Sequence, residues 1–241
     1  MTANLFTYLQ DTQRLLADAR QGIMNPADLT IYINRARRIL AGEAECVRVY
    51  ANLVLTPGQR QYGFSAVNVA AVNPAVEAPF NARFLWYVVG EGQKALRPRG
   101  WPWFAQYKLN NPVPNTGVPQ VWSQYGQGDS GSIFFDPVPD DAYTIILDTV
   151  CVPIELVDST TAEAIPYPWT DAVPFFAAYT ALLTAQARKE DAAMMLQQYE
   201  EYKNRARKIS NPSILPGLYE QATPIVSTAN QLGVQPGGAG G

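Results

Sequence analysis

The chain has 241 residues, which is long enough to bury a core as one larger domain or as two small ones. Apolar residues make up 47% of it and charged residues only 16%, a low charged share for a globular protein. The net charge of −3 argues against a protein whose affinity for nucleic acid comes from neutralising phosphates. This composition fits a subunit that buries much of its surface against copies of itself, and a charge-poor sandwich domain is the alternative.

The residue inventory also argues against catalysis. Histidine is absent, which removes the commonest general base, the commonest metal ligand and every Ser-His or Cys-His nucleophile pair. The two cysteines, Cys46 and Cys151, lie far apart and match no metal-ligand spacing, so we expect buried free thiols. We therefore expect no enzymatic activity, no metal and no cofactor, and cysteines kept in a reducing cytoplasm.

The sequence gives no sign of secretion or of a membrane span. Residues 1–10 lack a basic segment and an apolar run, so we expect no signal peptide. No stretch of about twenty apolar residues occurs, so we expect no membrane partner.

Two helices are predicted near the N-terminus. Apolar residues recur at helical spacing from Leu5 to Leu16 and predict the first helix. Asn25 is a good N-cap and Pro26 suits the first helical position. A second amphipathic helix is therefore predicted from Pro26 into residues 41–46.

The middle of the chain favours short strands separated by turns. The turn at residues 56–59 indicates a hairpin between the two strands that flank it. Residues 65–79 and 97–119 are rich in proline or small residues and are expected to be loops. The last strand is apolar on both faces and is predicted to be central in its sheet. The predicted strands span residues 47–55, 60–64, 83–89, 120–125, 131–135 and 143–152.

Helical periodicity returns in the C-terminal third. Phe176, Thr180 and Leu183 form one predicted stripe, and a charged cluster at residues 188–191 is interpreted as a turn before a second helix. After Ser210, recurring prolines and a glycine-rich end predict an extended arm.

The order of these elements indicates an α+β fold. Helices from both ends are expected to pack together as a helical bundle, while the strands form an inserted antiparallel β-sandwich-like domain. The predicted parts are a bundle of residues 1–46 and 166–209, a β domain of residues 47–165 and an extended C-terminal arm of residues 210–241.

Three further groups of residues have a chemical and a structural interpretation. The aspartates could bind calcium or act as paired acid and base, but prolines between them favour a turn. The cations could touch DNA phosphates, but exposed helix charges are more often solvated or paired. Residues 126–128 look glycine-rich but lack the pattern of a phosphate loop and are interpreted as a hairpin turn. The aspartates are Asp136, Asp140, Asp141 and Asp148, and the cations are Arg35, Arg37, Arg38, Arg205, Arg207 and Lys208.

The order of elements, together with four local strings, resembles a known family. The strings lie at residues 28–37, 56–62, 133–143 and 171–207. Together they resemble the head-to-tail adaptors (connectors) of tailed bacteriophages, the group related to the tail tubular proteins of short-tailed phages. The resemblance covers about residues 5–208 and does not extend into the arm.

The resemblance implies a structural protein of the virion neck that is assembled in the host cytoplasm. Such subunits form a ring, typically a dodecamer, beneath the portal protein and join the capsid to the tail. A tail or nozzle protein docks below, and genomic DNA passes through the lumen without specific binding.

A different function is suggested by the aromatic residues Trp101, Trp103, Tyr107 and Trp122. Side chains of this kind could stack on sugars, as in a carbohydrate-binding or receptor-binding β-sandwich module of a virion. Packing beneath the proline-rich segment or at a subunit contact is the structural alternative.

The arm carries a cluster of apolar residues that a solvating tail would not need. We predict that this cluster binds a partner, with the portal protein as the first candidate and a neighbouring copy as the second. The cluster consists of Ile214, Leu215, Leu218 and Tyr219.

Overall fold

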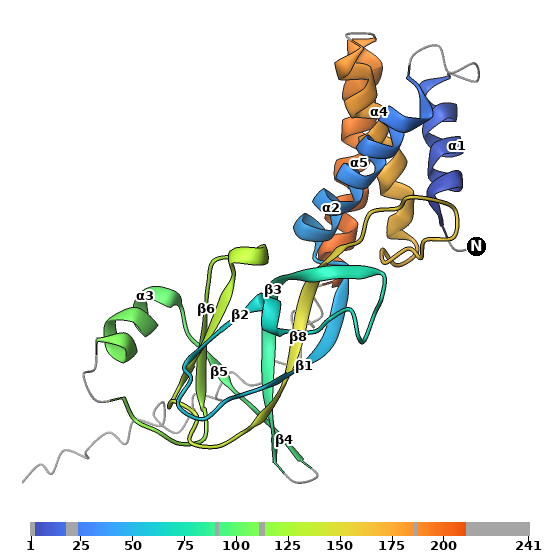
Figure 1. Cartoon of the computed structure of the whole chain (residues 1–241). Helices are drawn as coiled ribbons and strands as arrows, with labels where there is room; N and C mark the ends of the chain where they lie inside the picture. Colours follow the sequence, from blue (N-terminus) through green and yellow to red (C-terminus); the bar gives the residue numbers. More distant parts are fainter. Residues whose placement is uncertain (1–2, 18–23, 90–91, 111–113, 186–187, 211–241) are drawn as a thin grey trace, which may run out of the picture. The chain divides into compact units, whose positions relative to one another are not determined.

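The computed structural model describes residues 3–17, 24–89, 92–110, 114–185 and 188–210 (Figure 1). These residues form helices near both ends of the described chain and two four-stranded sheets between them. The predicted α+β class is confirmed.

The two N-terminal helices start at the local signals that predict them. Helix α1 (Leu5–Leu16) begins with a capping box, in which the Asn4 side chain accepts from the Thr7 N–H at 3.0 Å and the Thr7 hydroxyl accepts from the Asn4 N–H at 2.9 Å. Helix α2 (Pro26–Ala44) begins after Asn25, whose side chain accepts from the Asp28 N–H at 2.8 Å. The predicted N-cap is confirmed.

The C-terminal segment contains two helices, α4 (Ala172–Thr184) and α5 (Lys189–Ser210), so the predicted division into two helices is confirmed. The turn is predicted too late in the chain, because residues 189–191 of the charged cluster already lie in the first turn of α5. The predicted stripe on α4 is wrong, because Leu183 is 49% exposed while Ala177, Ala178 and Ala181 are fully buried. Helix α4 contacts α1, α2 and α5, and small side chains on its buried faces let these neighbours approach closely.

Eight strands form two sheets. In sheet A, every neighbouring pair is antiparallel; in sheet B, one pair at the edge is parallel. Sheet A has the order β1 (Arg48–Val54), β8 (Thr144–Pro153), β3 (Val76–Val89) and β4 (Gly92–Ala95). Sheet B has the order β2 (Gln61–Gly63), β7 (Ser132–Asp136), β6 (Val121–Tyr125) and β5 (Arg97–Pro98).

Strand β8 pairs with β1 on one side and with β3 on the other, so its predicted central position is confirmed. The predicted hairpin at residues 56–59 is wrong, because β1 pairs with β8 and β2 pairs with β7. The chain instead crosses between the sheets at this turn. Tyr62 fixes the crossing, because its hydroxyl accepts from the Thr56 N–H at 2.7 Å and lies 3.1 Å from the carbonyl oxygen of Gln59.

Two segments predicted to be loops contain regular structure. Strand β3 starts at Val76, and residues 97–109 hold β5, helix α3 (Trp101–Phe104) and a π-helical turn, η2 (Ala105–Leu109). The prolines are compatible with these elements, since Pro98 lies on an edge strand and Pro102 lies in the first turn of α3.

One hydrophobic cluster joins helices and both sheets. It includes Leu40 of α2, Leu53 of β1, Ile133 of β7 and Tyr199 of α5, each at most 3% exposed. Both cysteines are buried free thiols, as expected. The predicted boundaries of the bundle, the β domain and the arm stay predictions.

Candidate interaction surface

The outer face of sheet A is set by strand alternation and register. Strand β1 buries every second residue and turns Tyr50 and Val54 outward. Register places Tyr50 and Phe84 on either side of Asp148, and Trp86 beside Ile146. We call Tyr50, Val54, Phe84, Trp86 and Ile146 the aromatic face.

The three aromatic residues of this face are exposed or half-buried and lie next to one another, whereas exposed Asn52 separates Val54 from Tyr50 along β1. Tyr50 is 64% exposed, Val54 62% and Phe84 39%, while Trp86 and Ile146 are half-buried. The ring centroid of Trp86 lies 6.1 Å from that of Tyr50 and 6.1 Å from that of Phe84. Contiguous apolar surface of this kind is typical of an interaction site rather than of scattered exposed residues.

Sheet B shows what a covered outer face looks like. Helix α3 lies against it, with the Trp101 ring 4.7 Å from both Phe134 and Tyr125. Phe104 beside it is fully buried. No described residue covers the aromatic face of sheet A to this extent, since three of its five members are exposed.

An ion pair links the interior of the aromatic face, where Asp148 lies between Tyr50 and Phe84, to its edge where α5 ends. Asp148, only 1% exposed on its side chain, accepts from Nε of Arg48 at 3.0 Å. Nη1 of Arg48 also donates to the carbonyl oxygen of Ser210, the last described residue, at 3.2 Å. The C-terminal end of α5 is therefore tied to the edge of this face.

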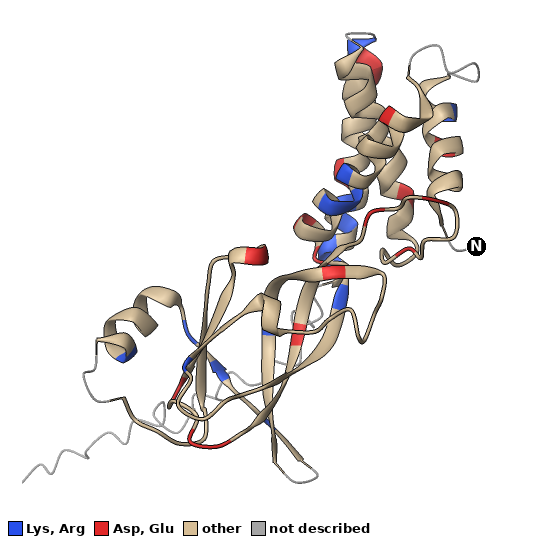
Figure 2. Cartoon of the chain, viewed as in Figure 1, with Lys and Arg blue, Asp and Glu red and all other residues tan. Residues whose placement is uncertain are grey.

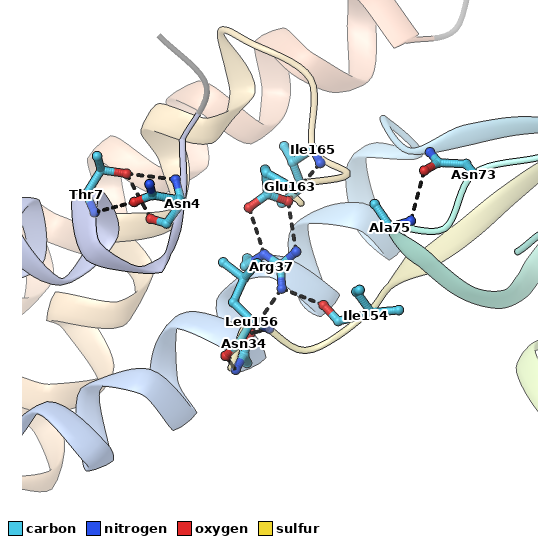
Figure 3. Close-up of polar contacts among 10 residues, drawn as sticks. All are labelled: Asn4, Thr7, Asn34, Arg37, Asn73, Ala75, Ile154, Leu156, Glu163 and Ile165. Atoms are coloured by element: carbon cyan, nitrogen blue, oxygen red, sulfur yellow. Dashed lines mark hydrogen bonds and ion pairs between the residues drawn. The ribbon is translucent and has the colours of Figure 1, made fainter. Parts of the chain in front are cut away.

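A buried network ties α2 to the segment that follows β8 (Figure 3). The guanidinium of Arg37 donates to both carboxylate oxygens of Glu163 at 2.9 Å, and its Nη1 donates to the Ile154 carbonyl at 2.7 Å. Asn34 donates to the Leu156 carbonyl at 3.1 Å and accepts from the Leu156 N–H at 2.9 Å. Because Arg37 is 1% exposed and Glu163 4%, each charge depends on the other for compensation.

The aromatic residues proposed as a sugar platform do not lie on one surface. Trp122 is 4% exposed and belongs to the hydrophobic core, while Trp101 packs between α3 and sheet B. Trp103 and Tyr107 remain exposed, with Arg99 5.1 Å and Lys108 5.8 Å from the Trp103 ring centroid. The structural interpretation therefore holds for Trp101 and Trp122.

The candidate aspartates take part in turns and ion pairs. Asp136 lies 2.7 Å from Lys108 and 3.8 Å from Arg60, and Asp148 pairs with Arg48. Asp140 accepts from the Tyr143 hydroxyl, and this bond raises the Tyr143 pKa to about 12. Within the described ranges, no three potential metal ligands lie together.

Lys and Arg are spread over helices and strands in Figure 2, and the candidate basic residues differ in their surroundings. Arg37 is buried, and Arg38 pairs with Glu77 at 3.5 Å and Glu155 at 3.3 Å. Arg35 is exposed on α2, and the basic residues at the end of α5 are exposed as well. The glycines at 126 and 128 have φ of 74° and 58° in the turn between β6 and β7, which confirms the hairpin turn.

The arm residues Ile214, Leu215, Leu218 and Tyr219 lie outside the described residues. Sequence reasoning missed the aromatic face. The sequence feature that could have revealed it is the alternation of exposed and buried residues along β1 and β3. In β3, however, Phe84, Leu85, Trp86 and Tyr87 put large side chains on both faces of the strand, so the sequence does not show which face is buried.

The described residues thus bring together ion pairs that fix elements to one another and an uncovered apolar face. Exposed apolar surface of this kind is typical of a protein–protein interaction site. A family profile described as SU10 adaptor protein matches residues 3–222, and the chain belongs to this family. Membership of this family indicates a structural adaptor protein of a phage. The match continues past Ser210 and so extends beyond residues 5–208, which carry the resemblance in the sequence.

A search of the curated proteins finds no match to the chain. Across the part of the chain that the structure describes, no helix has the length and apolar character needed to cross a bilayer.

Proposed function

We propose that this protein is a head-to-tail adaptor subunit that forms a ring beneath the portal protein and joins the capsid to the tail. The observation that carries this proposal is the SU10 adaptor match, which covers residues 3–222. A dodecamer is the ring that the family resemblance implies. A tail or nozzle protein docks below the ring, which is assembled in the host cytoplasm.

The chemistry of the chain supports self-association. Charged residues form only 16% of the sequence, and the aromatic face leaves large apolar side chains in solvent. A ring buries such surface at every subunit contact, and each contact repeats around the symmetry axis.

The charge of the chain supports passage of genomic DNA without specific binding. A net charge of −3 gives the subunit no overall attraction for phosphate. Most arginines with described partners are held by carboxylates, as in the pairs of Arg37, Arg48 and Arg38. DNA can therefore move through the ring without being retained.

The C-terminal arm is proposed to be an assembly contact made by Ile214, Leu215, Leu218 and Tyr219. Its partner is the portal protein or a neighbouring copy. Many weak contacts repeated around a ring give a firm attachment through avidity.

A stop codon in the gene for this protein tests the proposed function. We expect packaged heads that fail to join tails, and infectivity restored when the protein is supplied in trans. A stop codon in the gene for the tail protein is the matched control, since those heads should still carry this adaptor. Tailed, infectious particles made without the protein would rule the function out.

A further inference from the structure

The aromatic face leaves three apolar side chains more than a third exposed, on a sheet whose neighbour in the fold is covered by α3. We propose that the aromatic face of each subunit binds residues 214–219 of a neighbouring copy. This inference rests on the proposed function and names the surface through which the copies associate.

The composition of the face fits a protein contact. Trp and Tyr dominate the energetics of interfaces because they bury a large area with few rotatable bonds. Tyr50, Phe84 and Trp86 form one connected aromatic group, with Ile146 beside Trp86 in the register and Val54 farther along β1, beyond Asn52. Such a surface fits an apolar segment better than a charged one.

The chain carries a segment with matching chemistry. Residues 211–241 follow the described part, and four of the first nine are Ile214, Leu215, Leu218 and Tyr219. Prolines at 212 and 216 oppose a continuation of helix α5 and predict extended chain. The family match includes this cluster but stops at residue 222, before the glycine-rich end.

The end of α5 indicates why copies would exchange this segment. The Ser210 carbonyl is bonded to Arg48 at the border of the aromatic face, so every copy starts its arm beside an identical face. Fully extended chain covers about 3.3–3.6 Å per residue, so residues 214–219, four to nine positions past Ser210, can reach a surface about 13–32 Å away. Exchange of an identical element between copies is a low-cost route to association. Of the two candidate partners for the arm, the neighbouring copy is therefore the one we choose.

Cysteine pairing in the full-length chain tests the inference. One preparation carries Tyr50→Cys and a second, differently tagged, carries Leu218→Cys, and the two are mixed under mild oxidation with the cognate portal protein. The native thiols Cys46 and Cys151 are buried and do not compete. We expect a disulfide that joins the two tagged chains.

The matched control replaces Tyr50→Cys by Val157→Cys, which is 75% exposed and lies outside the aromatic face. This pair should link much less. The double variant Tyr50→Cys/Leu218→Cys should give a ladder of covalent dimers and larger species.

Three results would overturn the inference. The first is a Val157→Cys and Leu218→Cys pair that cross-links as fully as the Tyr50→Cys and Leu218→Cys pair. The second is a double variant whose disulfide forms only within one chain. The third is a Leu218→Cys subunit that cross-links to the portal protein and not to a neighbouring copy. The mass of the complex with the portal protein, measured after the disulfides are reduced, distinguishes failure of this inference from failure of the proposed ring function. A complete ring without the cross-link contradicts the inference alone, whereas a monomer that never associates contradicts the proposed function as well.

Discussion

At the scale of single residues, the network around Arg37 shows how a helix is attached to a loop by polar groups in a dry site. Arg37 meets two carboxylate oxygens and a main-chain carbonyl, and Asn34 adds two bonds to Leu156. The two-point ion pair and the added hydrogen bonds offset the free-energy cost of removing both charges from water. Loss of one partner would leave the other charge buried and unpaired.

Arg37→Ala is expected to lower the free energy of unfolding by about 3–5 kcal/mol, because Glu163 would remain buried without a cation. Arg35→Ala, on the exposed face of the same helix, is the matched control and should change it by less than about 0.5 kcal/mol. Denaturant unfolding followed by circular dichroism measures both. Equal stability of the two variants would contradict the role assigned to the network.

The two thiols give a second prediction at this scale. Burial raises the pKa of Cys46 to about 12 and that of Cys151 to about 11, from an ordinary value of 9.0. Both should resist a thiol reagent at pH 8 in the folded protein and react in denaturant.

The raised pKa values also set the direction of the pH dependence. A thiol ionises more readily in the unfolded chain, so the contribution to stability is complete below pH 9 and declines as the pH rises toward 11–12. Rapid labelling of either cysteine in native buffer would show that it is accessible, contrary to the structure.

At the scale of elements, the start of β7 depends on a glycine. A side-chain carbon at Gly131 would overlap the ring of Phe64 and lie 3.0 Å from the Gly128 carbonyl oxygen. Phe64 is 1% exposed and belongs to the core, so it cannot easily move away. The turn between β6 and β7 therefore packs directly on this ring.

Gly131→Ala is expected to cost about 1–3 kcal/mol through overpacking. Gly42→Ala is the matched control inside helix α2, where the added carbon would make an ordinary 3.8 Å contact with Phe80. That change should stabilise the protein by about 0.5–1 kcal/mol, because alanine favours a helix interior. Thermal unfolding measures both, and a Gly131→Ala variant as stable as Gly42→Ala would contradict the packing described for Phe64.

Helix starts could be predicted from the sequence, whereas the pairing of distant strands could not. Helix starts at Asn4 and Asn25 depend on hydrogen bonds to residues three positions away, so Asn25 could be predicted from its neighbours. Pairing of β1 with β8 joins residues about a hundred positions apart, as in Arg48 and Asp148, and no local pattern reveals it. The hairpin prediction failed for this reason, because it assumed that strands adjacent in sequence pair.

Part of the candidate interaction surface could likewise be predicted from the sequence, and part of it could not. The apolar cluster of the arm is readable from the sequence, since four apolar residues stand among prolines. The aromatic face is not, because its members come from three strands and become neighbours only through register. The family resemblance was read from the order of elements and is confirmed by the match over residues 3–222.

At the scale of the whole molecule, removal of the arm should separate folding from assembly. A chain truncated after Ser210 keeps every described core residue, so we expect its cooperative unfolding to be unchanged. Its assembly should be lost, since residues 214–219 are proposed to make the contact. Leu215→Asp with Leu218→Asp in the full-length chain should reproduce the loss.

Light scattering after size-exclusion chromatography compares the truncated and full-length chains with the portal protein present. Circular dichroism of the same samples is the folding control. A truncated chain that assembles as well as the full-length one would exclude the arm as the contact.

The central claim is that this chain forms a closed ring on the portal protein. The most direct measurement is the mass and symmetry of the complex between the full-length chain and its cognate portal, by light scattering and electron microscopy. We predict a ring with one defined stoichiometry, a dodecamer by family resemblance. A chain that stays monomeric, or binds the portal in single copies without a ring, would contradict the account.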